Sequence, residues 1–273
     1  MGLSSEAMKL QVVWFKRDLR WEDHAPLAAA VATGQPVVAL LLHEPSLWAQ
    51  PVYSNRHACF EYESAAELAG TRPLLGELDI RAVNAPEGRE TSNDAAEGRE
   101  TSNDAAAGRG TSNDAAAGRN HLPFFYVAAE ATEAYEALEA FAGIPIGAVY
   151  SHQEIGIETS FARDRHMKKW FKKRGITWHE SPYGSVRRGL KRRDDWNAHW
   201  NEVMFKEPLV QADWALGQAW KPSPPWIDWA QAHQVERPAR EAGVAQTGGA
   251  AWGHRYLRSF VAGGRGRGYM AHI

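Results

Sequence analysis

The stretch VVWFKRDLRWEDHAPLAAAV, residues 12–31, passes from an apolar run into a cluster of charges and then into an alanine-rich segment. The short β-branched and aromatic run at residues 10–15 is typical of a strand. Residues 24–34 predict a helix, with Asp23 as its N-cap and Pro26 in its first turn. The charges therefore lie in the turn after a buried strand. Two interpretations are open: they pair with one another at a solvated edge, or they line a binding crevice.

Strand-like and helical segments alternate along the chain, which predicts a doubly wound α/β fold with a five-stranded parallel sheet of the flavodoxin or Rossmann-like type. The expected strands are residues 10–15, 36–43, 123–128, 147–151 and 176–180, and the expected helices are 24–34, 55–70, 130–143 and 158–174. Ligands of such sheets bind beyond the carboxyl ends of the strands, where the strand order reverses. With the common order 3-2-1-4-5, the charged turn and the loop SHQEIGIE (151–158) flank one crevice.

A decapeptide repeat interrupts this pattern. GRETSNDAAE, GRETSNDAAA and GRGTSNDAAA follow one another between Gly88 and Ala117. The unit has no large apolar residue and cannot offset its own ordering entropy. We expect residues 86–120 to form a disordered insertion in a surface loop.

The composition excludes several classes of site. The net charge of −2 by itself indicates no particular partner, and the first strand is followed by no glycine-rich phosphate fingerprint. The lone Cys59 excludes an internal disulfide and a cysteine-ligated metal cluster, which favours a cytoplasmic setting. We expect no metal site. The N-terminus has no signal-peptide pattern, and no apolar run is long enough for a membrane span.

The pattern changes after residue 181. We interpret residues 8–181 as the α/β domain, 182–247 as a long linker and 248–273 as the start of an all-helical domain. Residues 163–193 carry twelve Lys or Arg against two acids. That stripe is either a phosphate contact or a solvated helix face continued by a linker that pairs with a further domain. Seven tryptophans follow residue 190: Trp196, Trp200, Trp214, Trp220, Trp226, Trp229 and Trp252.

Three segments resemble one family. VVWFKRDLRWEDHAPLAAA with PVVALLLHEPSLW (12–48) resembles the opening of the photolyase/cryptochrome family, in which a strand enters a W-F-x-R-D-L-R turn. AVYSHQEIGIETSFARDRHMKKWFKKRGITWHE (148–180) resembles its fourth strand, next helix and fifth strand. SVRRGLKRRDDWNAHWNEVM (185–204) and RYLRSFVAGGRGRGYMAHI (255–273) resemble its linker and the first helix of its FAD-binding domain. The resemblance covers nearly the whole chain apart from the repeat.

The resemblance implies a cofactor crevice in the α/β domain. That domain in the family often holds an antenna chromophore, a folate or a deazaflavin or lumazine, which passes excitation energy to FAD. The resemblance places Arg17, Asp18, His152 and Glu154 near this pocket, with Glu154 as the main polar contact, because a carboxylate suits the amino edge of a pterin. Arg17 and Asp18 are expected to pair with each other. Tyr269 matches a tyrosine at the edge of the flavin site.

The family implies light-driven repair of cyclobutane pyrimidine dimers in damaged DNA through a following helical domain. We therefore expect an antenna domain that is a fragment, with no catalytic residue of its own, which leaves its status as an enzyme open. We also expect the late tryptophans to lack their partner domain, so that the chain self-associates or is poorly soluble. Two alternatives remain: a cryptochrome-type blue-light receptor without repair, and a light-independent α/β domain that binds a small molecule.

Overall fold

A computed structural model describes residues 7–70, 122–190, 192, 194, 196–209, 219–240 and 246–262. Its centre is a five-stranded sheet in which every neighbouring pair of strands is parallel. The strands are β1 (Leu10–Phe15), β2 (Val37–Leu42), β3 (Phe124–Val127), β4 (Ile146–His152) and β5 (Thr177–Ser181). The helices are α1 (Ala25–Val31), α2 (Pro45–Trp48), α3 (Asn55–Gly70), α5 (Ala131–Phe141), α6 (Glu158–Lys173), α7 (Trp196–Met204), α8 (Pro224–Ala232) and α9 (Ala250–Val261). The predicted α/β class is confirmed.

The strand order is β3-β2-β1-β4-β5, so the order reverses between β1 and β4. Every residue of β1 and β2 is buried, which explains why both read as uninterrupted apolar runs rather than alternating ones. The carboxyl ends of β1 and β4 lie side by side, because Val13 pairs with Tyr150 near the ends of both strands. The charged turn and the loop after β4 therefore flank one crevice, as the order 3-2-1-4-5 predicts.

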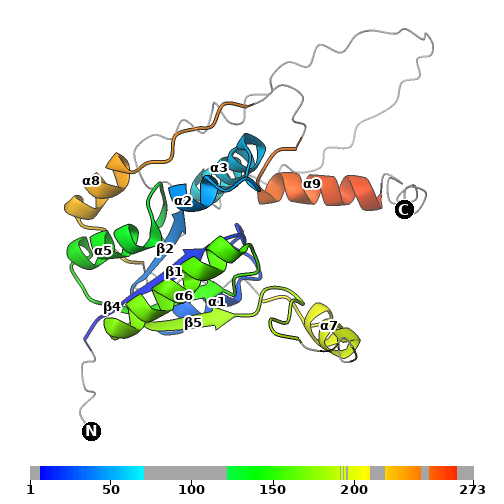
Figure 1. Cartoon of the computed structure of the whole chain (residues 1–273), viewed down its shortest axis with the longest axis horizontal. Coiled ribbons are helices and arrows are strands. Elements are labelled where there is room, and N and C mark those ends of the chain that lie inside the picture. Colours follow the sequence, from blue (N-terminus) through cyan, green and yellow to red (C-terminus); the bar gives the residue numbers. More distant parts are fainter. Residues whose placement is uncertain are drawn as a thin grey trace, which may run out of the picture. The chain divides into compact units, whose positions relative to one another are not determined.

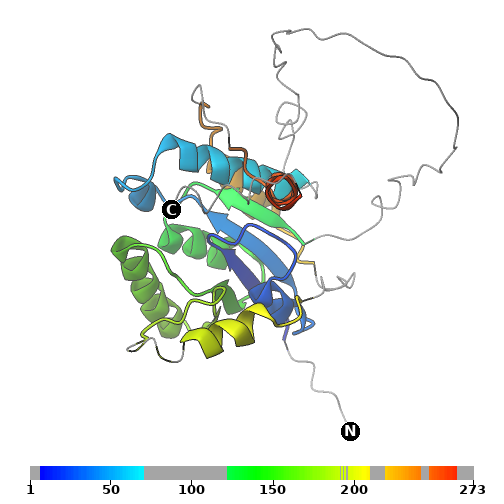
Figure 2. The same cartoon turned by 90° about the vertical axis from the view of Figure 1, so that its right-hand side faces the viewer.

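Helices cover both faces of the sheet, as Figures 1 and 2 show. One face packs Trp14, Leu40 and Phe125 against α5, α6 and α8. The other packs Phe15 and Leu41 against α1 and α3. Successive residues of a strand point to opposite faces, so Trp14 and Phe15 enter different cores. Both faces of the sheet are thus covered, and a ligand would approach the sheet at the carboxyl ends of its strands.

Helix α1 begins one residue later than predicted. The N-cap is His24, whose Nδ1 accepts a hydrogen bond of 3.1 Å from the backbone N–H of Leu27. Asp23, the predicted cap, instead adopts a φ of 46°, and its Oδ1 accepts from the N–H of Leu209. Asp23 was predicted because aspartate is a common N-cap. The prediction was wrong because the imidazole of the next residue, His24, caps the helix instead.

Two of the late tryptophans belong to the α/β core. Trp226 on α8 is fully buried and packs against Phe125, and Trp220 is 5% exposed. The indole N–H of Trp220 donates to the carbonyl of Ala142, and its backbone N–H donates to Val37. The expectation that these side chains lack a partner was therefore wrong for Trp220 and Trp226. The segment interpreted as a linker contains part of this domain's own core.

Helices α7 and α9 have no buried residue, and α9 exposes Leu257 and Val261. The start of α9 is tied to α3, since the N–H of Ala251 donates to Glu67 and that of Gly249 to Ser64. None of the helices that the structure describes has the length and apolar character needed to cross a bilayer. The repeat at 86–120, Trp214 and Tyr269 lie outside the described residues.

The buried position of Trp226 predicts a large effect of truncation. Trp226→Ala should lower the free energy of unfolding by about 3–5 kcal/mol, the usual cost of removing a large aromatic side chain from a core. Trp252→Ala on α9 is the control and should cost less than about 1 kcal/mol. Urea denaturation of the full chain measures both, and equal small losses would show that α8 does not pack on the sheet.

Candidate ligand-binding cavity

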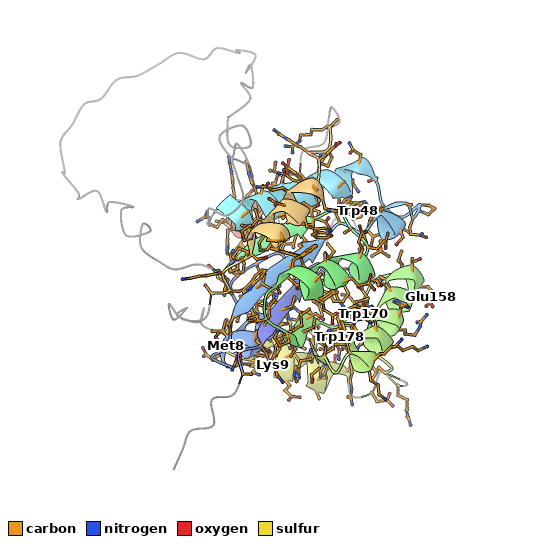
Figure 3. All side chains as sticks on the ribbon, turned by 90° about the vertical axis from the view of Figure 1, so that its left-hand side faces the viewer. Met8, Lys9, Trp48, Glu158, Trp170 and Trp178 are labelled. Carbon is orange, nitrogen blue, oxygen red and sulfur yellow. The ribbon has the colours of Figure 1, made fainter. Side chains whose placement is uncertain are left out.

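A cavity of about 550 Å³ lies beyond the carboxyl ends of β1, β2 and β4. This volume lies in the range of sites for cofactor-sized molecules. Figure 3 shows Met8 and Lys9 at the amino end of β1, with Trp48 and Glu158 toward the opposite end of the sheet. The lining residues are Trp14, Phe15, Lys16, Arg17, Leu19, Leu42, Glu44, Leu47, Trp48, Val52, Tyr53, His57, Phe60, Glu61, Glu154, Ile155, Gly156, Ile157, Ser160 and Arg163. The cavity is thus apolar and aromatic, with a few charged groups.

Trp48 and Tyr53, from the segment between β2 and α3, form one wall of the cavity, and His43 supports Trp48 from outside the lining. The rings of His43 and Trp48 stack with their centroids 4.5 Å apart, and Tyr53 follows Trp48 at 4.8 Å. The Glu61 carboxylate lies 3.0 Å from Nδ1 of His43 and also accepts a hydrogen bond from the hydroxyl of Tyr126. Planar aromatic walls fit a flat conjugated ring. Sequence reasoning did not single out this wall.

Arg163 connects the charged groups of the cavity. Its guanidinium on α6 pairs with Glu44 after β2, with Glu154 after β4 at 2.8 Å, and with Asp164 at 2.9 Å. Burial raises the pKa of Glu44 despite this pairing. Burial alone would also raise the pKa of Glu154, but Arg163 and Lys16 outweigh it and lower that pKa. One cation therefore fixes three carboxylates from three segments.

Lys16 is buried at the base of the turn. Its Nζ lies 2.7 Å from Asp164 and 5.0 Å from the ring centres of both Trp14 and Trp178. Burial lowers its pKa, and the pairing with Asp164 opposes that effect. The ammonium group of Lys16 is thus held by one carboxylate and two aromatic rings, so its role is to fix the turn rather than to present a charge to solvent.

Glu154 and Arg17, two of the four predicted site residues, line the cavity. Glu154 is 3% exposed and accepts hydrogen bonds from the N–H groups of Ile155 and Gly156. Arg17 donates to Glu154 at 3.4 Å and to the hydroxyl of Tyr53 at 2.9 Å. The expected pair between Arg17 and Asp18 does not form, because Asp18 turns inward while Arg17 points to the cavity wall.

Asp18 and His152, the other two predicted residues, are not among the lining residues. They form a buried latch with His24. The Asp18 carboxylate accepts from the N–H of Lys16 at 3.0 Å, hydrogen-bonds Nδ1 of His152, and lies 2.5 Å from Nε2 of His24. Burial alone would raise the pKa of Asp18, but the two imidazoles hold it well below its usual range.

Asp18, His24 and His152 have the composition of a metal site, with their ligand atoms within 4.8 Å of one another. The capping bond argues against that use. Nδ1 of His24 accepts the N–H of Leu27, so the proton of the neutral imidazole is on Nε2, the atom that faces Asp18. A protonated nitrogen cannot be a metal ligand. We therefore interpret the cluster as a hydrogen-bonded latch that joins the β1 turn, α1 and β4.

Comparisons with known proteins agree with this architecture. Residues 11–82 match the family model described as DNA photolyase. Over 77 residues, 28% of this chain, the sequence is 32% identical to deoxyribodipyrimidine photo-lyase of Vibrio cholerae. In these segments the chain resembles the photolyase/cryptochrome family. The matched segment contains β1 from Gln11 onward, the charged turn, β2, and Trp48 and Tyr53 of the aromatic wall.

Solved structures of this family share the fold. The Synechocystis cryptochrome superposes with a TM-score of 0.53 at 17% identity, covering 98% of this chain and 49% of its own. The class III photolyase of Agrobacterium tumefaciens superposes with a TM-score of 0.56 at 16% sequence identity, and the match covers 95% of this chain and 46% of that protein. The photolyase of Sulfolobus tokodaii superposes with a TM-score of 0.52 at 16% sequence identity, and the match covers 91% of this chain and 46% of that protein. The chain spans about half the length of these three structures, and its match covers 15% of the Vibrio protein.

The Arg163 cluster predicts a strong asymmetry between two arginines of α6. Arg163→Met should lower the free energy of unfolding by about 3–5 kcal/mol, because Glu44 and Glu154 would remain buried without their cation. Arg165 forms only an exposed pair with Glu158, so Arg165→Met should cost about 0–1 kcal/mol. Denaturant titrations measure both, and equal losses would contradict the cluster's structural role.

The latch predicts a pH dependence of stability. Burial lowers the pKa of His24, so below about pH 6.5 the unfolded chain binds more protons than the folded one. Stability should therefore fall as the pH falls from 7.5 to 5.5, by at most about 1.4 kcal/mol per pH unit from this group. His24→Asn keeps a capping oxygen but does not titrate, and should flatten the slope.

Unfolding free energies at several pH values test this expectation. His254→Asn, a change of the same kind on the exposed helix α9, controls for the loss of a histidine. If wild type and His24→Asn lose stability in parallel, the latch is not the group that titrates.

Proposed function

We propose that this chain carries the antenna-chromophore domain of a photolyase-family protein. The observation that supports the proposal is the position of the cavity, at the switch point of the sheet, with an aromatic wall on one side and fixed charges on the other. A flat conjugated ring would lie between Trp48 and Ile157, while the charged groups orient its polar edge. When bound, such a group would absorb light and pass on excitation energy.

The residues of this chain would supply position and shielding rather than chemistry. Lys16 pairs with Asp164, and Arg163 pairs with Glu44. Because these ion pairs already hold the side chains in place, the cavity would need little rearrangement when a ligand enters. Leu42, Leu47 and Ile157 exclude water from the ring. In this proposal no residue of the described domain is catalytic.

The activity of a whole protein is part of the same proposal. We infer from the family that the excitation energy would reach FAD in a following helical domain and drive repair of pyrimidine dimers in damaged DNA. A cryptochrome-type light receptor would use the same antenna cavity, and solved structures of both kinds share this fold. The Sulfolobus tokodaii photolyase was solved with two FAD molecules, which supports flavins as probes of the cavity.

Binding of chromophores to the purified chain tests the proposal. Methenyltetrahydrofolate, a ribityllumazine and FMN are titrated while fluorescence anisotropy is recorded. At least one should bind, and Trp48→Ala should weaken it by about 3–10-fold through loss of aromatic contact. Trp252→Ala, far along the chain on α9, should leave the affinity unchanged. Absence of binding for all three, or equal effects of both variants, would contradict the proposal.

A further inference from the structure

The hydrogen-bonding groups of the cavity differ in how much capacity remains free. Both oxygens of Glu154 are engaged: Oε1 accepts from the N–H of Ile155, the N–H of Gly156 and Nε of Arg17, and Oε2 accepts from Arg163. Glu44 accepts from Arg163 and from the N–H of Ala131. A carboxylate has about four lone-pair sites, so Glu154 with four donors has little capacity left for a ligand, whereas Glu44 accepts only two hydrogen bonds. Glu154 therefore holds the cavity wall instead of recognising a donor edge.

Arg17 has free hydrogen-bonding capacity that Glu154 lacks. Its side chain is 39% exposed, and a guanidinium carries five N–H donors. Its described hydrogen bonds use only Nε and Nη2, toward Glu154 and Tyr53. Within the described part of the chain, Nη1 has no acceptor. The hydroxyl of Tyr53 accepts from Arg17 and is left with its own O–H to donate.

The guanidinium is also held in one place. A Cβ at position 156 would lie 2.3 Å from Nη2 of Arg17, so glycine there lets the arginine lie flat against the loop after β4. Tyr53 holds the same nitrogen from the other side at 2.9 Å. Glu154 is the acid nearest to Arg17, at 3.4 Å, but it divides its charge with Arg163 at 2.8 Å. The positive charge of Arg17 is therefore only partly neutralised.

We infer that Arg17 and Tyr53 form an oxyanion subsite at the edge of the cavity, which binds the phosphate or carboxylate on the side chain of the chromophore. A planar fork of N–H donors matches the oxygens of either group. This inference rests on the proposed function, and it names the ligand class: a flat ring with an anionic tail. The anionic group, rather than an amino edge at Glu154, would select the ligand.

FMN and riboflavin, which differ by one phosphate, measure the subsite directly. The full chain should bind FMN at least about 10-fold more tightly than riboflavin, the effect expected of one charge-assisted hydrogen-bonded pair. Arg17→Met should bring the ratio of the two dissociation constants close to one, and Tyr53→Phe should reduce it in part. Arg165→Met removes the same charge outside the cavity and should leave the ratio unchanged.

Folic acid against its diamide, in which both glutamate carboxylates are replaced by uncharged amides, is the equivalent pair for a carboxylate tail. If the protein prefers the anionic ligand of either pair and loses that preference in Arg17→Met, the subsite is supported. The pair that shows the preference tells whether the subsite binds a phosphate or a carboxylate. Equal affinities within both pairs would overturn the subsite while leaving the cavity's proposed role intact. If none of these ring compounds binds, the proposed function fails, and inorganic pyrophosphate tests the subsite separately. Pyrophosphate should raise the thermal midpoint of wild type but not of Arg17→Met. No rise in wild type would overturn the subsite.

Discussion

A single buried carboxylate fixes the geometry on which the cavity depends. Asp18 joins the turn after β1 to the cap of α1 through His24 and to the end of β4 through His152. Because the carboxylate also accepts the N–H of Lys16, the turn cannot rotate without breaking several hydrogen bonds in a dry environment. Lys16 and Arg17 are thereby directed to opposite sides of the turn, one into an ion pair and the other toward the cavity.

The charges of both signs in KRDLRWEDH thus have separate tasks rather than one shared purpose. Arg20 donates to the carbonyls of Glu22 and Asp23 and closes the turn. Lys16 reaches Asp164 on α6. Buried ion pairs of this kind are weak sources of stability, since desolvation offsets much of the attraction. Their benefit here is fixed geometry: the walls of the cavity keep one arrangement before any ligand arrives.

The sheet was predictable from the sequence because its strands are buried on both faces, which leaves uninterrupted apolar runs such as residues 36–43. The crevice followed from the strand order, and the resemblance then singled out Arg17 and Glu154. Arg163 was seen only as one member of a basic stripe, because its acid partners come from segments that the fold alone brings together. The same is true of His24 and of Trp226, whose partners Asp18 and Phe125 are neighbours only in space.

The central claim is that the crevice between the β1 turn and the β4 loop is a preformed ligand site. A crystal structure of the full chain grown with FMN tests it most directly. The account predicts a ring lying between the Trp48 wall and Ile157, its phosphate on Arg17, and Asp18 still bound to both histidines. Density for the ring elsewhere on the molecule, or a crevice that must break the Asp18 contacts to admit it, would contradict the account.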